Sequence, residues 1–460
     1  MSGIWLIVAL VIAIVLVIFM IAKLKIHAFL SLMSVSLLLA IVVGIPLVKI
    51  PTIIGEGFSS IFKNIGIVII LGALIGAILE KTGAALKLAD MVVGTIGEKR
   101  PNTAMMIIGW VVGIPVFCDS GYVVLNPIRK ALAQKIAAAN PIGMAVALSG
   151  GLFISHNLVP PTPGPIAAAG ALGVAEHLLL VILMGVIISI PILIALSFVS
   201  KFLGKNEISK QEKDEIFKTY EELKAEFGKL PSGFNAIMPI LAPIFFMALG
   251  SIAAILKFDG FLGSLCAFLG APIIALSIGV LFGIYQLYSS NKISEFYDIT
   301  EECLKIVGPI IFITAAGGVL GKVITEAGFV GFMKENASIV SSVGIFFPFI
   351  IAAVLKTAQG SSTVAIVTTA SILGTYADPN SLMAVLGLNT SLAAALCVMA
   401  IGCGAMCVSH ANDSYFWVVT NFSGLSAELG YKTQTLMTLI ISVVGIISVF
   451  ILSIILLWKF

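Results

Sequence analysis

Long apolar runs follow one another along almost the whole chain. The first covers residues 4–22, and further runs cover 29–47, 66–79, 178–199, 236–256, 271–287, 303–319, 339–355, 392–408 and 436–457. A helix needs about 20 apolar residues to cross a hydrocarbon core that is about 30 Å thick. Most runs are apolar on every face, as in helices that contact lipid or one another. The pattern predicts an all-α polytopic membrane protein with about 10–12 transmembrane segments.

Polar residues interrupt this pattern at two places in the amino-terminal half. Apolar arms, each too short for a full crossing, flank Cys118-Asp119-Ser120-Gly121. We expect a re-entrant hairpin there, with its tip at 118–121. An apolar stretch at 143–154 then ends at the polar and proline-rich segment 155–165. This segment predicts a helix that is broken within the membrane.

The same order returns in the carboxyl-terminal half. A hairpin tip is expected at 356–363, and a helix break at 409–414. Both breaks begin with an aliphatic residue and Ser-His, and an Asn follows. Two related, inverted repeats, each with a re-entrant hairpin and a broken helix, explain this order.

The interruptions also predict how the chain is divided. We expect scaffold helices in 1–100 and 233–335, transport cores in 101–200 and 336–430, and a carboxyl-terminal transmembrane helix in 431–460. Between the halves, residues 201–232 are expected to form a charged connector, because 201–229 holds seven lysines and seven acidic residues. Its apolar residues recur at helical spacing, which predicts an amphipathic surface helix without transport chemistry.

Composition narrows the class of protein. The chain of 460 residues is 59% apolar and 11% charged, with a mean hydropathy of +1.15, whereas soluble chains carry about 25% charged residues. The net charge of +3 is dispersed, which argues against nucleic acid as a partner. The six cysteines lack metal-ligand spacing and the density of a disulfide scaffold, so no metal or cofactor is expected. The sequence contains no Gly-x-Ser-x-Gly or His-Glu-x-x-His motif that would support an intramembrane enzyme.

Broken helices have a known use in membranes. Unwound backbone at membrane depth is tolerated where it is buried in protein or lines a wet cavity. Paired breaks are typical of secondary transporters, which bind substrate and ion near the midplane. The N-terminus of a half-helix favours an anion, and carbonyl groups at the preceding helix end can hold a cation. The two arginines, Arg100 and Arg129, lie in sequence that looks loop-like or near a helix end, so we expect no arginine clamp at the centre. This favours a monocarboxylate over a more highly charged acid.

The candidate site residues lie at the four interruptions. A carboxyl group in apolar sequence is costly unless it is paired or functional, and imidazole titrates near neutral pH. The candidates for proton coupling are therefore Asp119, His156, His410 and Asp413. The candidates for substrate binding carry hydroxyl or amide groups, and they are Ser120, Ser155, Asn157, Thr162, Gln359, Ser361, Ser362, Thr363, Asn412 and Ser414.

Structural roles compete with these assignments. Asp119 can instead cap a helix that starts at Gly121. Either histidine can donate to carbonyl groups at a helix end, and the hydroxyl groups of the second tip can satisfy one another. Lys356, just before that tip, can offset Asp119 or meet a substrate carboxylate, but we favour snorkelling to the membrane interface.

Four motifs together resemble the gluconate permease family of proton-coupled symporters, and the likeness extends from Ala28 to Leu457. The motifs are Gly113-Ile-Pro-Val-Phe-Cys-Asp-Ser-Gly-Tyr122, Ser155-His-Asn-Leu-Val-Pro-Pro-Thr-Pro-Gly-Pro165, Gln359-Gly-Ser-Ser-Thr-Val-Ala365 and Ser409-His-Ala-Asn-Asp-Ser414. The resemblance implies uptake, across the inner or plasma membrane, of a small hydroxylated monocarboxylate with a proton. The substrate is gluconate in most members and glycerate or D-serine in others.

Similarity to the wider ion-transporter superfamily implies a homodimer with elevator-type alternating access. Three alternatives stay open at this point. Sodium could replace the proton, because the same oxygen atoms suit that ion. A channel and, more remotely, an intramembrane enzyme are the others.

Overall fold

A computed structural model describes residues 4–96, 100–135, 140–203, 230–327, 344–410 and 413–457. Throughout these ranges the chain forms helices and connecting turns, and no strand. The helices of the first half are α1 (Ile4–Ala22), α2 (Ala28–Val42), α3 (Ile50–Ile61), η1 (Phe62–Gly66), α4 (Ile67–Lys81), α5 (Ala84–Ile96), α6 (Pro101–Gly113), α7 (Cys118–Lys135), α8 (Pro141–Leu158), α9 (Pro163–Ala171), η2 (Ala175–His177) and α10 (Leu178–Phe202).

The helices of the second half are α12 (Gly233–Ile255), α13 (Gly260–Gly270), α14 (Pro272–Ser289), η3 (Ile293–Glu295), α15 (Phe296–Glu326), α18 (Phe346–Gln359), α19 (Ser362–Leu373), α20 (Leu382–Val385), α21 (Ser391–Ala405), α22 (Ser414–Phe422), α23 (Ala427–Gly430), η4 (Tyr431–Thr435) and α24 (Leu436–Leu457). The predicted all-α class is confirmed. The charged connector was predicted at 201–232, and its residues 204–229 lie outside the described residues.

Several helical segments are suited to a bilayer. Six of those described are long and apolar enough to cross it, namely Pro141–Ala171, Ala175–Phe202, Gly233–Ala254, Pro272–Ser289, Ile293–Ile324 and Ala427–Leu457. The first of these contains the broken helix α8–α9, and its residues from Ile142 to Ala171 are buried. Its interrupted backbone is therefore surrounded by protein, where a break in a membrane helix is tolerated.

In both repeats the hairpin packs on the first half of the broken helix that follows it. The hairpin α6–α7 packs on the broken helix that starts with α8, and the hairpin α18–α19 packs on the broken helix that starts with α21. The repeats also exchange partners, because α9 packs on α19 of the second hairpin while α22 packs on α7 of the first. Hairpin tips and helix breaks from both repeats consequently meet in the middle of the molecule.

Glycines let these pairs approach closely. A Cβ atom on Gly151 of α8 would lie 2.2 Å from the Met106 carbonyl oxygen of α6. In the other repeat, a Cβ atom on Gly404 of α21 would lie 2.3 Å from the Phe349 carbonyl oxygen of α18. Both contacts are with backbone atoms, which have little room to move. Each hairpin arm can therefore pack this closely on its partner helix only because the residue at the contact is glycine.

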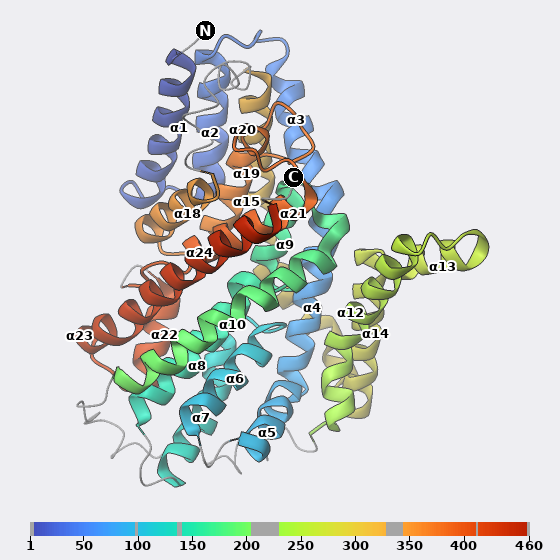
Figure 1. The fold of residues 1–460 in the computed structure, drawn as a ribbon, viewed down its shortest axis with the longest axis vertical. Coiled ribbons are helices and arrows are strands. Elements are labelled where there is room, and N and C mark those ends of the chain that lie inside the picture. The colour runs from blue at the N-terminus through green and yellow to red at the C-terminus, as the bar shows by residue number, and fades with distance from the viewer. Residues whose placement is uncertain are drawn as a thin grey trace.

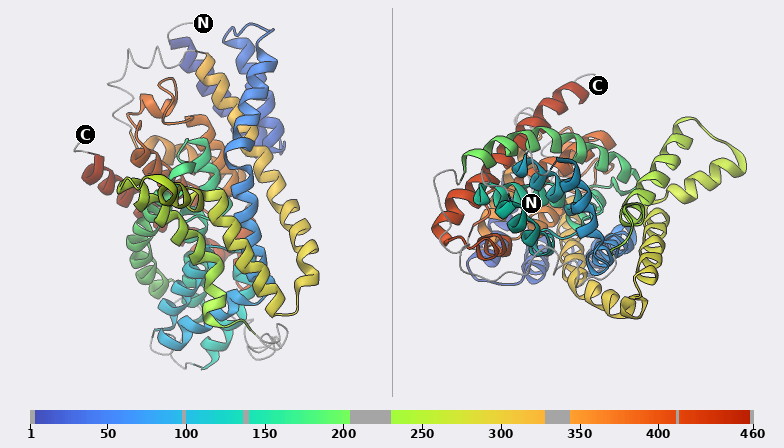
Figure 2. Two further views of the ribbon diagram at one scale, coloured as in Figure 1. Left: turned by 90° about the vertical axis from the view of Figure 1, so that its right-hand side faces the viewer. Right: turned by 90° about the horizontal axis from the view of Figure 1, so that it is seen from below.

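The other helices surround this core. Helix α15 lies against α2, α3, α4 and α19, and α10 and α24 cross the body obliquely (Figures 1 and 2). Helices α12, α13 and α14 stand at the side of the body and project away from it. Large apolar side chains on this projection are exposed, including Phe245 and Phe261, as expected where a helix meets lipid or another protomer.

The predicted limits of all four interruptions were wrong. The second break was predicted at 409–414, but α21 already ends at Ala405 and α22 starts at Ser414. Helix α7 already starts at Cys118, so the first tip is 114–117 and not 118–121. Helix α8 continues to Leu158, so the first break is 159–162 and not 155–165. Helix α18 continues to Gln359, so the second tip is Gly360 and Ser361 and not 356–363. Proline and glycine, rather than polar residues, end these helices: α8 stops at Pro160-Pro161, which lack N–H groups, and α18 stops at left-handed Gly360.

Candidate functional site

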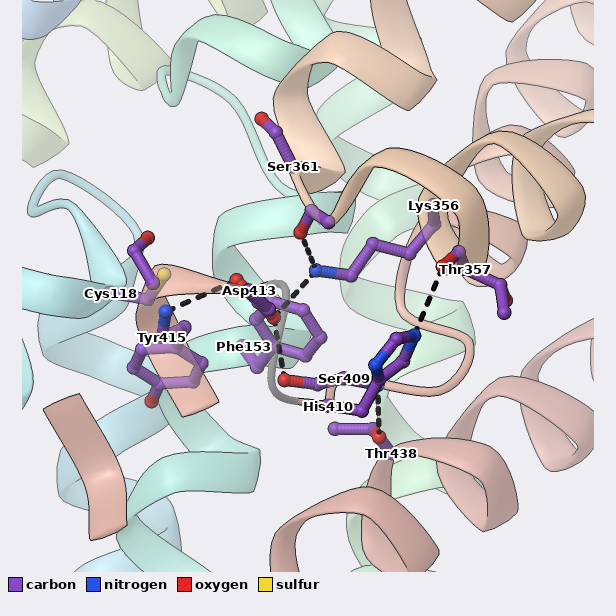
Figure 3. A network of polar contacts seen from close by, with 12 residues as sticks. Cys118, Phe153, Lys356, Thr357, Ser361, Ser409, His410, Asp413, Tyr415 and Thr438 are labelled. Carbon is purple, nitrogen blue, oxygen red and sulfur yellow. Dashed lines mark hydrogen bonds and ion pairs between the residues drawn. The ribbon is translucent and has the colours of Figure 1, made fainter. Parts of the chain in front are cut away.

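A buried ion pair lies where the second hairpin tip meets the second helix break (Figure 3). Lys356 belongs to the last turn of α18, and Asp413 is the N-cap residue of α22. The Lys356 Nζ atom lies 2.5 Å from Asp413 Oδ2 and also donates to the Gly360 carbonyl oxygen. The exposed fraction is 0% for Lys356 and 4% for Asp413. Snorkelling of Lys356 to the interface was therefore the wrong interpretation.

Two more donors converge on the Asp413 carboxylate. Ser409 Oγ donates to Oδ2 at 2.5 Å, and the Tyr415 backbone N–H donates to Oδ1 at 3.1 Å. The second bond comes from the first turn of α22, whose N-terminal dipole also favours a negative charge. Asp413 is thus held by an ammonium, a hydroxyl and an amide.

Aromatic rings enclose the pair on one side. Lys356 Nζ lies 5.5 Å from the centroid of the Phe153 ring, and Phe153 of α8 stacks on Tyr415 at a centroid distance of 5.2 Å. The Tyr415 hydroxyl donates to the Ser149 carbonyl oxygen at 2.9 Å. These contacts join the second repeat to the first and exclude water from one face of the ion pair.

Threonines of the last helices hold the unwound backbone of the second break. The Ser409 N–H donates to Thr438 Oγ1 at 3.0 Å, and Thr435 Oγ1 donates to the Ser409 carbonyl oxygen at 2.5 Å. His410 Nε2 donates to the Thr357 carbonyl oxygen at 3.0 Å, which ties the break to the hairpin (Figure 3). Backbone groups that lost their helical partners are thereby satisfied at membrane depth.

Asp119 connects the first hairpin to this network. It lies inside the first turn of α7, so it is not the cap of a helix that begins at Gly121. Ser414 Oγ of α22 donates to Asp119 Oδ1 at 3.3 Å, and Cys118 Sγ lies 3.6 Å from Oδ2. Asp119 is only partly buried, whereas Asp413 is almost fully buried. Two carboxyl groups on different repeats therefore face one region.

The candidates of the first break mainly bond to their own helix or turn. Ser155 Oγ donates to the Gly151 and Leu152 carbonyl oxygens, and Asn157 Nδ2 donates to the Phe153 carbonyl oxygen at 2.7 Å. Thr162 Oγ1 donates to the Val159 carbonyl oxygen at 2.9 Å.

His156 is buried in α8, with its ring 6.0 Å from that of Phe117. Among the residues that the structure describes, no hydrogen-bond partner reaches His156 Nδ1 or Asn157 Oδ1.

The remaining candidates lie around the second tip. Ser361 Oγ caps α19 by accepting from the Val364 N–H at 3.3 Å, Ser362 is buried, and Thr363 is partly exposed. Asn412 lies outside the described residues, and so do the side chains of Ser120 and Gln359. The Gly360 carbonyl oxygen, one residue before the N-cap Ser361, accepts from Lys356 Nζ, so the start of α19 lies beside this ammonium group (Figure 3).

Comparison with known proteins places the whole chain in one group. A family model described as GntP family permease matches residues 5–455. The inner membrane permease YgbN of Escherichia coli is 32% identical over 94% of this chain and 95% of its own length. A gluconate permease of Pseudomonas aeruginosa is 29% identical over 95% of each chain.

The chain belongs to the GntP permease family.

This permease is therefore a transporter with several membrane-spanning helices, and not an enzyme. The expected resemblance to gluconate permeases is confirmed. The crystal structure of the Alcanivorax borkumensis YdaH transporter matches 92% of the permease and 96% of its own chain, with a TM-score of 0.61 and 15% identity. At that identity the match concerns the fold alone.

Some residues of the network escaped sequence reasoning. Thr435 ends the short helix η4, and Thr438 and Phe153 lie in longer apolar helices, and none of the three carries a local signal of a role. Lys356 did carry one, because a lysine inside an apolar run next to a hairpin tip needs an anionic partner unless it reaches water. Arg129 is buried as well, but it bonds to Asn126 and to the Pro141 carbonyl oxygen, where it fastens α7 to the start of α8.

Proposed function

We propose that this permease takes up gluconate, or a similar small hydroxylated monocarboxylate, across the inner membrane together with a proton. The observation that supports this most directly is the buried pair of Lys356 and Asp413 at the junction of a hairpin tip and a helix break. Ionisable groups at membrane depth are costly and mark transport pathways and proton relays. The names of two relatives, an inner membrane permease and a gluconate permease, agree with this location and substrate class.

We assign each candidate residue a role in transport from its burial and its hydrogen bonds. Asp119, His156 and Asp413 form the proton-coupling set, in which the partly exposed Asp119 receives the proton from solution and passes it on. His410, the fourth candidate, positions the second break through its bond to the Thr357 carbonyl oxygen. The substrate hydroxyl groups bond to the hydroxyl and amide side chains of both repeats: Ser120, Ser155, Asn157, Thr162, Gln359, Ser361, Ser362, Thr363, Asn412 and Ser414. Neutral donors and acceptors in this number suit a polyhydroxylated acid better than a plain fatty acid.

We also propose a homodimer that works by an elevator motion. The hairpins and broken helices of the two repeats interlock through the α9–α19 and α7–α22 contacts, which favours their moving as one body. The projecting helices α12, α13 and α14, with their exposed apolar side chains, supply a surface for a second protomer (Figure 2).

Uptake by reconstituted protein tests the substrate and the coupling ion. We expect labelled gluconate to accumulate in vesicles under an imposed proton gradient, and D-glycerate and D-serine to be taken up less. Collapse of the proton gradient should abolish accumulation. Accumulation that persists without it and follows a sodium gradient instead would overturn proton coupling. Mass measurement on the same preparation tests the homodimer, which a monomeric mass would exclude.

A further inference from the structure

We propose that Lys356 Nζ, Ser409 Oγ and the Tyr415 N–H form a binding site for the substrate carboxylate, which Asp413 fills as an internal anion in this structure. Protonation of Asp413 frees these three donors for the carboxylate of the substrate. The inference rests on the proposed function and specifies its chemistry. Asp413 thereby acts as a tethered competitor of the transported acid.

The geometry of the donors carries this inference. They come from three separate places, namely the end of α18, the second break and the first turn of α22, and they meet on one carboxylate. An ammonium, a hydroxyl and an amide at a helix N-terminus are the donors that a free carboxylate requires. The Asp413 side chain is short and attached to the same helix end, so it can leave these donors without unfolding α22.

Charge balance explains why proton and acid must move together. With Asp413 ionised, the pair of Lys356 and Asp413 has no net charge. With Asp413 protonated and a substrate carboxylate bound to Lys356, the sum is again zero. A proton without the acid leaves one buried positive charge, and the acid without a proton leaves one negative charge, and either is costly in this environment. Only the empty and the fully loaded sites are favourable, which couples one proton to one monocarboxylate.

The exchange involves no redox step. The proton adds to an oxygen atom of the Asp413 carboxylate, and one O–H bond forms. The ion pair of Lys356 with Asp413 is replaced by an ion pair of Lys356 with the substrate. Release reverses both events on the other side of the membrane.

Other titratable groups face Asp413 and must be separated from it. Asp119 and Cys118 approach from α7, His156 from α8, and Lys356 from α18, and Tyr415 follows on α22 itself. Asp119 is the alternative carrier of the coupled proton, because it accepts a hydrogen bond from Ser414, the residue next to Asp413. Variants of both carboxyl groups are therefore compared.

The number of protons that the protein takes up when gluconate binds tests the proposed carboxylate site directly. Calorimetry of gluconate binding to the purified full-length protein, in two buffers that differ in ionisation heat, counts the protons bound per substrate. We expect one proton for the wild-type protein. Asp119→Asn should also bind one proton, because Asp119 relays the proton and does not hold it in the loaded state, but its gluconate uptake in vesicles should be slower. We expect no proton for Asp413→Asn, together with an affinity that no longer depends on pH. In vesicles, Asp413→Asn should exchange labelled gluconate across the membrane but fail to accumulate it.

Lysine variants complete the test. Lys356→Gln, alone or combined with Asp413→Asn, should weaken gluconate binding at least tenfold. Glu428→Gln is the matched control, because Glu428 pairs with Lys432 at 2.8 Å but both side chains are exposed, and it should behave like the wild type.

The outcomes separate the two proposals. Three results would overturn the inference: the wild type binds no proton with gluconate, Asp413→Asn still binds one, or Asp119→Asn binds none. The first result is obtained on the wild-type protein, so it does not depend on the folding of a variant. The wild type could instead fail to accumulate gluconate but bind another hydroxy acid from a panel together with one proton. That result would overturn only the proposed substrate. Asp413→Asn protein with the melting temperature of the wild type should still bind a monocarboxylate. If it binds none, the proposed carboxylate site does not exist.

Discussion

The two histidines of the Ser-His pairs occupy matching places in the sequence but differ in their surroundings. His156 is helical and buried, with Nδ1 unpartnered among the described residues. His410 lies in unwound backbone, is partly exposed, and bonds to the Thr357 carbonyl oxygen. The contact of His410 joins the second break to the second hairpin, which is a positioning role that does not require titration.

Substitution of His410 distinguishes positioning from proton transfer. We expect His410→Ala to slow gluconate uptake up to about tenfold, the effect of losing one hydrogen bond that positions the site. His410→Gln should restore most of the rate, because its amide N–H reaches the same carbonyl oxygen but cannot titrate. Initial rates of gluconate uptake into vesicles measure the effects of both substitutions. Equal loss in the two variants would show instead that His410 carries a proton.

At the scale of helices, the second break depends on side chains from a neighbouring helix. The backbone between α21 and α22 has left its helical bonding, and Thr438, Thr435 and Ser442 of the last helices bond to Ser409 and to the Cys403 carbonyl oxygen. The first break is shorter and is satisfied mainly from within, by bonds such as that of Thr162 to Val159. The two breaks thus have the same place in the repeats but different supports.

Removal of a support should destabilise the protein. Thr438→Val leaves the buried Ser409 N–H without its partner, and we expect a loss of about 1–3 kcal/mol in the free energy of unfolding. Thr433→Val is the matched control, since Thr433 is equally buried but bonds only to the Leu429 carbonyl oxygen of its own helical turn. Thermal unfolding in detergent compares them. Equal melting temperatures for the two variants would contradict the support by Thr438.

At the scale of the whole molecule, the interlocked repeats carry the ion pair within one body. Contacts of α9 with α19 and of α22 with α7 cross between the repeats, as does the Tyr415 bond to Ser149. The body has the same charge when it is empty and when it is fully loaded, because the proton and the monocarboxylate cancel, so a complete transport cycle moves no net charge across the membrane. Each uncompensated charge would instead add about 2.3 kcal/mol per 100 mV.

Membrane potential should therefore have little effect on uptake. We expect the rate of gluconate uptake under a fixed proton gradient to stay constant when a potassium diffusion potential is imposed on the vesicles. The same vesicles with an electrogenic carrier verify that the potential is established. A rate that rises steeply with negative interior potential would mean that more than one proton accompanies each monocarboxylate.

Part of this picture follows from local sequence. Apolar runs predicted the all-α membrane class, and the two series of hairpin and break predicted the repeats, since hydrophobic length and interruption are properties of consecutive residues. The limits of the interruptions were misplaced because polar residues such as Ser155 and His156 were taken as helix ends. A buried helix accommodates such residues, and Pro160-Pro161 and Gly360 end the helices instead.

The sequence by itself determined that a few ionisable groups lie within the membrane at the breaks, because their apolar flanks leave them no other place. Only the tertiary structure decided which of them meet. Lys356 and Asp413 are separated by 57 residues, and Asp119 and Ser414 by 295. The free energy of a buried charge depends on its nearest partner, and that partner is set by the packing of hairpin tips against helix breaks rather than by neighbours in the chain.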